Sequence, residues 1–209
     1  MSPLKAAFFA LLLSLLASVI AATMIVGHTS GQLAVRPQPQ AVLTPVAAGI
    51  TAQNVPKAQE MQVLFKRRLL IPVEGVSRAQ LRDNFDETRG SSRRHEALDI
   101  MAPRGTPVLA VDDGRVVKLF NSKAGGITLY QFDPDAGFAY YYAHLDRYAE
   151  GIKEGTVLKR GDLVGYVGTT GNATPGAPHL HFTIFRLRPD KRWWTGDAVN
   201  PYPFLVESR

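Results

Sequence analysis

The amino-acid sequence predicts a mainly β protein: a small antiparallel β-sheet or sandwich domain, preceded by an N-terminal transmembrane helix and a flexible linker. From Leu70 onward, short runs of β-branched and aromatic residues alternate with Gly, Asp, Asn and Pro, and no amphipathic helix separates these runs. The length of 209 residues and the hydrophobic content of 45% suffice for one core and an appendage. The expected strands are 106–111, 114–120, 127–132, 138–143, 163–167 and 180–185.

The first element is a run of 22 uncharged, mostly apolar residues, 6–27. At about 1.5 Å per residue it can cross a hydrocarbon core of about 30 Å, whereas a cleaved signal peptide has only about 7–15 apolar residues. We therefore expect residues 1–27 to be a membrane anchor, and cleavage near the small residues 17–23 is the alternative. Lys5 precedes the run and Arg36 is the first cation after it, which places the N-terminus inside and the rest of the chain outside the cytoplasm.

The next elements are a linker and the domain that carries the strands. Residues 28–60 are rich in Pro, Gln, Ala, Thr and Val and show neither a helical nor an alternating period, which is typical of an extended tether. Residues 61–209 form the predicted domain. The segment 57–70 is either a short helix or a first strand, and 77–84 is the one further helix that the pattern predicts.

Charge and cysteine content narrow the chemistry. The chain has 24 Lys and Arg against 18 Asp and Glu, and this net charge of +6 favours contact with anionic wall polymers, headgroups or nucleic acid, although a merely basic surface explains it equally well. A location outside the cytoplasm argues against nucleic acid. Because there is no cysteine, disulfides and thiolate chemistry are excluded, and any metal must be bound by His, Asp or Glu.

Four of the five histidines fall in three short motifs. The motifs are His95-Glu-Ala-Leu-Asp99, Tyr141-Tyr-Ala-His144 and His179-Leu-His181. Imidazole and carboxylate suit zinc, and three protein ligands with one open position are typical of a catalytic zinc site. The number of imidazoles exceeds what one such site needs, which indicates that some have another task. Neither His-x-His nor His-x-x-x-Asp alone establishes a metal site, because both are common by chance.

Strand geometry explains the spacing within these motifs. On an extended strand, side chains two positions apart point to the same face. His95 and Asp99 would then face a cleft together, as would His179 and His181. The same alternation turns Glu96 away from His95 and Asp99, which makes it the weaker candidate for a general base. His28, beside the apolar run, is not expected to take part.

The sequence around these motifs resembles the LytM/lysostaphin family of zinc endopeptidases, the duplicated-hybrid-motif peptidases of bacterial peptidoglycan. The resemblance covers residues 70–205, and its motifs follow the family's order. They are 95–108, 113–116, 142–145, 157–165 and 168–171 with 178–182. The implied fold is the small, mainly antiparallel β domain of that family, which agrees with the strand pattern.

The resemblance also implies roles for five residues. His95, Asp99 and His181 would bind Zn²⁺, while His144 and His179 would be the catalytic pair. Zinc would lower the pKa of the water bound to it and polarise the carbonyl of the scissile bond. A neutral imidazole near its ordinary pKa of about 6.5 takes up the proton, and an N–H donor stabilises the oxyanion. Which histidine does which is left open.

The implied function is hydrolysis of peptide bonds in peptidoglycan cross-links or stem peptides. The implied location is a bacterial cytoplasmic membrane with the catalytic domain in the periplasm or outside, or secretion if the N-terminal segment is cleaved. Two alternatives are a wall-binding or hydrolase-activating module that retains the fold, and a peptidase for an extracytoplasmic protein. Intact ligand positions argue against the first alternative.

This sequence departs from the family at two places. Position 97 is Ala where the family often has Gly. Many relatives carry a Tyr shortly before the first histidine, but the corresponding stretch here is Arg89-Gly-Ser-Ser-Arg-Arg94, so no oxyanion group is assigned.

Three features have two interpretations. Tyr140, Tyr142 and Trp193-Trp194 either contact substrate or fill the core, and the loop 168–178 is either a substrate lip or a turn.

Overall fold

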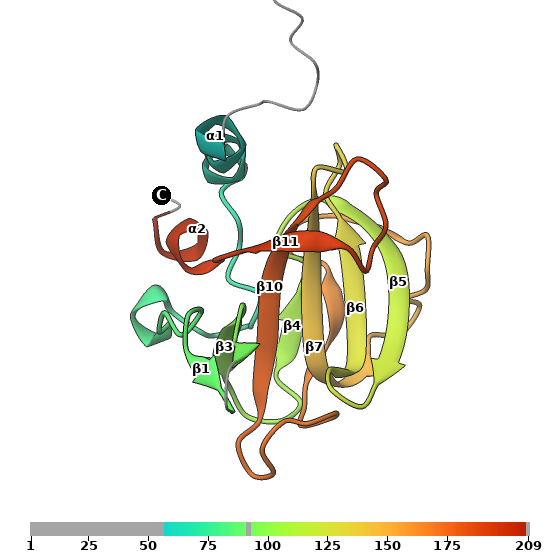
Figure 1. Cartoon of the computed structure of the whole chain (residues 1–209). Helices are drawn as coiled ribbons and strands as arrows, with labels where there is room; N and C mark the ends of the chain where they lie inside the picture. The colour runs from blue at the N-terminus through green and yellow to red at the C-terminus, as the bar shows by residue number, and fades with distance from the viewer. Residues whose placement is uncertain (1–56, 91–92, 208–209) are drawn as a thin grey trace, which may run out of the picture. The chain divides into compact units, whose positions relative to one another are not determined.

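The computed structural model describes residues 57–90 and 93–207 (Figure 1). The predicted anchor, 1–27, and most of the predicted linker, 28–60, lie outside these residues. In the part of the chain that is described, no helix combines the length and the apolar character needed to cross a membrane.

The described residues form one antiparallel sheet of nine strands and a separate two-stranded hairpin. The strands of the large sheet are β3 (Leu98–Met101), β4 (Pro107–Leu109), β5 (Gly114–Ser122), β6 (Gly126–Phe132), β7 (Phe138–Tyr148), β8 (Val157–Leu158), β9 (Leu163–Val167), β10 (His179–Leu187) and β11 (Gly196–Val199). The hairpin pairs β1 (Thr88–Arg89) with β2 (Arg93–Arg94). The main order is β11-β10-β7-β6-β5-β8, with β3 beside β10 and with β9 joining β7 to β4. Figure 1 shows that the sheet curls, and the predicted mainly β, antiparallel class is confirmed.

All six expected strands are present, and three extend at least two residues beyond their expected bounds. β5 extends to Ser122, β7 continues beyond Ala143 to Tyr148, and β10 extends to Leu187. The strands that were not expected have only two to four residues, too few to show a period of two. β3, β8 and β11 form by pairing with strands distant in the sequence, and β1 and β2 form by pairing with each other.

Two helices pack against each other near one edge of this domain. They are α1 (Lys57–Arg67) and α2 (Tyr202–Val206). Leu64 is fully buried, and the Phe65 ring lies 4.6 Å from the Phe204 ring. At the end of α1, the Arg67 guanidinium lies 3.0 Å from the Asp112 carboxylate. The segment 57–70 therefore begins as a helix, one of its two predicted forms.

The predicted helix over residues 77–84 is wrong. Only a single 3₁₀ turn, η1 (Arg78–Gln80), forms there, and Leu81 is already extended with φ −72° and ψ 141°. The segment that follows must stay non-helical because its carbonyl groups are used elsewhere. The carbonyl oxygens of Phe85 and Glu87 each accept an amide hydrogen bond of 2.9 Å from the segment that begins with the first motif histidine.

Tyr140 and Tyr142 are fully buried in the core, so the core interpretation holds for both. The Tyr142 hydroxyl accepts a hydrogen bond from the backbone amide of Val111 at 3.0 Å and donates to Gln131 Oε1 at 2.8 Å. The Tyr140 hydroxyl donates to Asp112 Oδ2 at 2.9 Å. These phenols therefore satisfy buried polar groups that lie between strands.

Tyr142→Phe should lower the free energy of unfolding by about 1–3 kcal/mol, because it leaves a buried amide and a buried carboxamide oxygen without their partner. Urea denaturation followed by circular dichroism measures the change. Tyr166→Phe is the control, since Tyr166 is only partly buried and its hydroxyl makes no hydrogen bond to the described residues. Equal stability of Tyr142→Phe and the native chain would contradict the role given to this hydroxyl.

Candidate active site

Strand pairing brings the predicted site residues together. β10 lies between β3 and β7, and in this register His181 is directly opposite both Asp99 and Ala143. His144 follows Ala143 where β7 leaves β10 and continues beside β9. Its φ of 59° is an uncommon, left-handed conformation for a residue with a side chain. The change of strand partner therefore occurs at a candidate catalytic residue.

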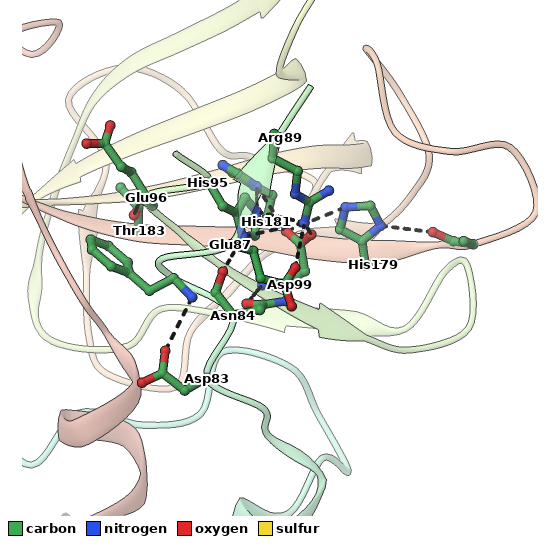
Figure 2. Close-up of polar contacts among 12 residues, drawn as sticks. Asp83, Asn84, Glu87, Arg89, His95, Glu96, Asp99, His179, His181 and Thr183 are labelled. Atoms are coloured by element: carbon green, nitrogen blue, oxygen red, sulfur yellow. Dashed lines mark hydrogen bonds and ion pairs between the residues drawn. The ribbon is translucent and has the colours of Figure 1, made fainter. Parts of the chain in front are cut away.

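His95, Asp99 and His181 form a close cluster of metal-ligating atoms (Figure 2). His95 Nε2 lies 2.8 Å from Asp99 Oδ1 and 3.1 Å from His181 Nδ1. His181 Nδ1 lies 3.0 Å from the same Asp99 oxygen. The structure thus assembles all three predicted zinc ligands at one point.

Asn84 orients two of these ligands. Its carbonyl oxygen lies 2.9 Å from His95 Nδ1, and because a carbonyl can only accept, this nitrogen carries the ring proton. The Asn84 side-chain oxygen also accepts the amide hydrogen bond of Asp99 at 3.2 Å. In the neutral His95 ring, Nε2 then has a free lone pair that points toward the cluster. Such outer hydrogen bonds commonly fix the ring orientation of metal-binding histidines.

His144 and His179 lie beside the cluster and are held in the same way. His144 Nδ1 donates to the carbonyl oxygen of Thr170 at 2.8 Å, and His179 Nδ1 donates to that of Ala177 at 2.9 Å. Each neutral ring therefore has its lone pair at Nε2. The two rings are 5.0 Å apart, and His179 Nε2 lies 3.7 Å from Asp99 Oδ1.

Burial and neighbouring groups set the protonation of the site. Burial alone would raise the pKa of Asp99, but contacts with His181 and His95 outweigh it and lower this pKa far below its usual range. Burial lowers the pKa of His181, and it lowers the pKa of His144 to about 4. At neutral pH Asp99 is therefore a carboxylate and both imidazoles are neutral, the states required of metal ligands and proton acceptors.

Sequence reasoning missed Arg89 as a site residue. Its guanidinium makes an ion pair with Asp99 Oδ2 and lies 3.3 Å from His95 Nε2 (Figure 2). The hairpin of β1 and β2 carries Arg89 over the cluster, and the sequence offers no pattern that would reveal this contact. Asn84 was missed for the same reason, because both residues reach the site through tertiary contacts.

Two adjoining depressions flank the cluster. One, of about 360 Å³, extends past Arg89 toward the loop 168–178, and the other, of about 240 Å³, extends past Glu96 and Tyr141. The residues that line both are Arg93, His95, His144, Asn172 and His181. Together they form an open groove that passes over the candidate site. A depression of about 550 Å³ elsewhere, along 68–78, is lined by none of the described histidines.

The loop 168–178 contributes Asn172, Ala173 and Thr174 to this groove, and its interpretation as a substrate lip stays a prediction. The tryptophan pair lies further away. Trp193 packs 4.9 Å from the ring of Tyr130, while Trp194 is 59% exposed.

Glu96 points away from the ligands, but the predicted reason is wrong. Regular alternation begins only at β3, and Glu96 precedes this strand with a φ of 55°. A left-handed backbone conformation, rather than an extended strand, sets its direction, and Figure 2 shows its carboxylate away from Asp99. The conclusion that Glu96 is the weaker candidate for a general base is retained on this different ground.

The sequence model of peptidase family M23 matches residues 93–201, just over half of the chain. The chain belongs to peptidase family M23. The resemblance to lysostaphin and LytM-type endopeptidases is thus confirmed, and the matched residues contain all five predicted site residues.

Individual relatives and solved structures agree with this family. The chain is 33% identical over 121 residues to the L-Ala–D-Glu endopeptidase of Bacillus subtilis, covering 56% of this chain and 36% of the relative. It is 33% identical over 112 residues to lysostaphin of Staphylococcus simulans, covering 53% and 21%. A putative glycyl-glycine endopeptidase lytM from Ruminococcus gnavus matches with a TM-score of 0.59 and 30% identity over 72% of this chain and 64% of that one. The match therefore spans about a third or less of the two curated relatives.

The donor atoms of the cluster fit a bound Zn²⁺. His95 Nε2 and Asp99 Oδ1 are both acceptors, 2.8 Å apart, and without a proton or a cation between them they repel each other. Two imidazoles and one carboxylate are a ligand set that catalytic zinc commonly has. Arg89 already places one positive charge against Asp99, which shows that this site favours a cation.

Asp99→Ala and His181→Ala should each lower zinc occupancy well below one ion per chain, because either change removes one of three ligands. Elemental analysis after dialysis against a weak chelator measures this. Asp190→Ala removes an exposed carboxylate from the loop before β11 and serves as the control. Full occupancy in both ligand variants would rule out this ligand set.

Proposed function

We propose that this chain is a zinc-dependent endopeptidase that hydrolyses peptide bonds in peptidoglycan cross-links or stem peptides. The observation that carries the proposal is the pair His144 and His179, each with Nδ1 bound to a backbone carbonyl and Nε2 free, beside a three-donor cluster. A site that only holds a metal does not need this second pair. The names of the relatives, which include a peptidoglycan DD-endopeptidase of Vibrio cholerae, support the substrate class.

His95, Asp99 and His181 would hold the zinc, which supplies a Lewis acid and makes water more acidic when bound. The chain's own residues then move protons. His144 is neutral at pH 7, since burial lowers its pKa to about 4, and its free Nε2 accepts a proton from the attacking water. His179 has the same arrangement at Nε2 and can accept or return a proton at the leaving amine or stabilise the oxyanion.

A wall-binding or hydrolase-activating module is the second candidate. Such a module would keep the fold and the groove but would not need an intact set of ligands and proton acceptors. All five of these side chains are present and assembled here, so the enzymatic function is favoured.

Digestion of purified muropeptides tests the function. The full chain, loaded with one zinc, should convert cross-linked dimers to shorter peptides, and mass spectrometry of the products identifies the scissile bond. Removal of zinc by a chelator should stop the reaction, and added zinc should restore it. Absence of cleavage for every muropeptide, with zinc bound and no partner protein, would favour the activating module.

His144→Ala and His179→Ala should separate metal binding from turnover. Each variant should keep about one zinc per chain while turnover falls by about 10²–10⁴, the usual effect of losing a general acid–base or oxyanion group. Zinc content and turnover are measured on the same preparations. Loss of zinc in either variant would mean that the histidine is a ligand instead.

We further propose that residues 1–27 anchor the chain in the bacterial cytoplasmic membrane and hold residues 61–209 outside the cytoplasm. The length of the apolar run and the cation before it support this topology. The full chain should therefore remain in the membrane fraction, and deletion of residues 6–27 should release it. A mature N-terminus near Thr23 in a soluble exported fraction would show cleavage.

A further inference from the structure

Glu96 is held in an unfavourable backbone conformation on the wall of the smaller depression. Its φ of 55° lies in the left-handed region, which is unfavourable for a residue with a side chain. Two hydrogen bonds hold Glu96 there. Its amide donates to the Phe85 carbonyl at 2.9 Å, and the Thr183 hydroxyl donates to the Glu96 carbonyl. Gly or Asn would adopt this conformation at lower cost. In this conformation Glu96 lines the depression.

The depression beside Glu96 has aromatic walls. The Tyr130 and Tyr141 rings are 4.5 Å apart, and Phe185 lies 6.0 Å from Tyr141. All three line the same depression as Glu96. The carboxylate of Glu96 is exposed and makes no ion pair with any described residue. A free carboxylate next to aromatic faces is a favourable environment for an ammonium group.

A free cation borders the same depression. Arg93, in β2, is exposed and lines this depression together with Glu96. It makes no ion pair with Glu96 or with another described residue, whereas its neighbour Arg94 pairs with Asp86 at 3.4 Å. One carboxylate and one guanidinium, both without a partner, thus lie at one depression. This arrangement matches a group that carries an ammonium and a carboxylate together.

We propose that Glu96 and Arg93 bind the zwitterionic end of a diamino dicarboxylic acid side chain in the substrate. Glu96 pairs with the ammonium and Arg93 with the carboxylate on the same carbon, while the aromatic rings contact the aliphatic part. Diaminopimelate in a stem peptide has such an end when its side-chain amine is free. The inference rests on the proposed function, and it identifies the class of peptide that the groove selects. Glu96 and Arg93 are specificity residues and take no part in proton transfer.

Three cross-linked muropeptide dimers test this inference. They differ only in the third residue of the donor stem. This residue is diaminopimelate with a free side-chain end, diaminopimelate with its side-chain amine acetylated, or lysine. The full-length wild-type chain is compared with Glu96→Gln and Arg93→Gln. Arg94→Gln and Glu150→Gln are matched controls, because both are exposed and neither residue lines the groove.

Glu96→Gln should lower kcat/KM about tenfold on the two dimers with a free amine and leave the acetylated dimer unchanged. Arg93→Gln should lower kcat/KM on the free diaminopimelate dimer by a similar factor and leave the lysine dimer unchanged. Zinc content should not change in either variant. An equal loss on all three dimers would overturn the proposal and give Glu96 a role in the chemistry or in folding. No change on any dimer would also overturn it.

Binding without turnover separates this inference from the proposed function. Calorimetry with an uncross-linked tripeptide that ends in diaminopimelate should give about tenfold weaker binding to Glu96→Gln than to the wild-type chain. If no dimer is cut, the proposed function fails, and this difference in affinity still supports the zwitterion site. Equal affinities, or no binding to the wild-type chain, would overturn it.

Discussion

The position of one strand, β10, controls the whole candidate site. Because β10 pairs with β3 on one side and with β7 on the other, His181 lies between Asp99 and Ala143. A shift of β3 by one residue would turn Asp99 to the opposite face and replace it with an apolar neighbour. Leu98, Ile100, Leu180 and Phe182 are buried on the core face, so a shift would also expose them. The hydrophobic core and the metal-ligand cluster therefore require the same register.

The site is also organised by backbone carbonyl groups. The carbonyl oxygens of Asn84, Thr170 and Ala177 each accept the Nδ1 proton of a different histidine. All three come from loops. These loops have no regular secondary structure, and their carbonyl groups determine which ring nitrogen of each histidine faces the groove.

The groove joins chemistry and recognition in one surface. Neutral imidazoles and a carboxylate occupy its centre, while cationic and anionic side chains border it at different points. Glu96 and His144 both have left-handed backbone conformations, and the amide of each donates a hydrogen bond to a carbonyl of a neighbouring segment, Phe85 and Gly125 respectively. Such strain persists only where the surrounding structure determines it fully, and it is common at functional sites. Of the five non-glycine residues with positive φ among the described residues, Glu96 lies on the wall of this groove and His144 at its centre.

The sequence by itself determined the β class, six strands, the family and the five residues of the cluster and its neighbouring pair. The β class and the strands follow from short-range patterns, namely alternation along strands and turn residues between them, whereas the family and the five residues follow from the resemblance of the ordered motifs to that family. Only the tertiary structure decided that residues 77–84 are not a helix, that Tyr140 and Tyr142 belong to the core, and that Arg89 and Asn84 reach His95. It also decided the direction of Glu96, which depends on contacts with Phe85 and Thr183. The physical reason is that these features depend on hydrogen bonds between segments up to 87 positions apart, and such contacts cannot be predicted from the local sequence.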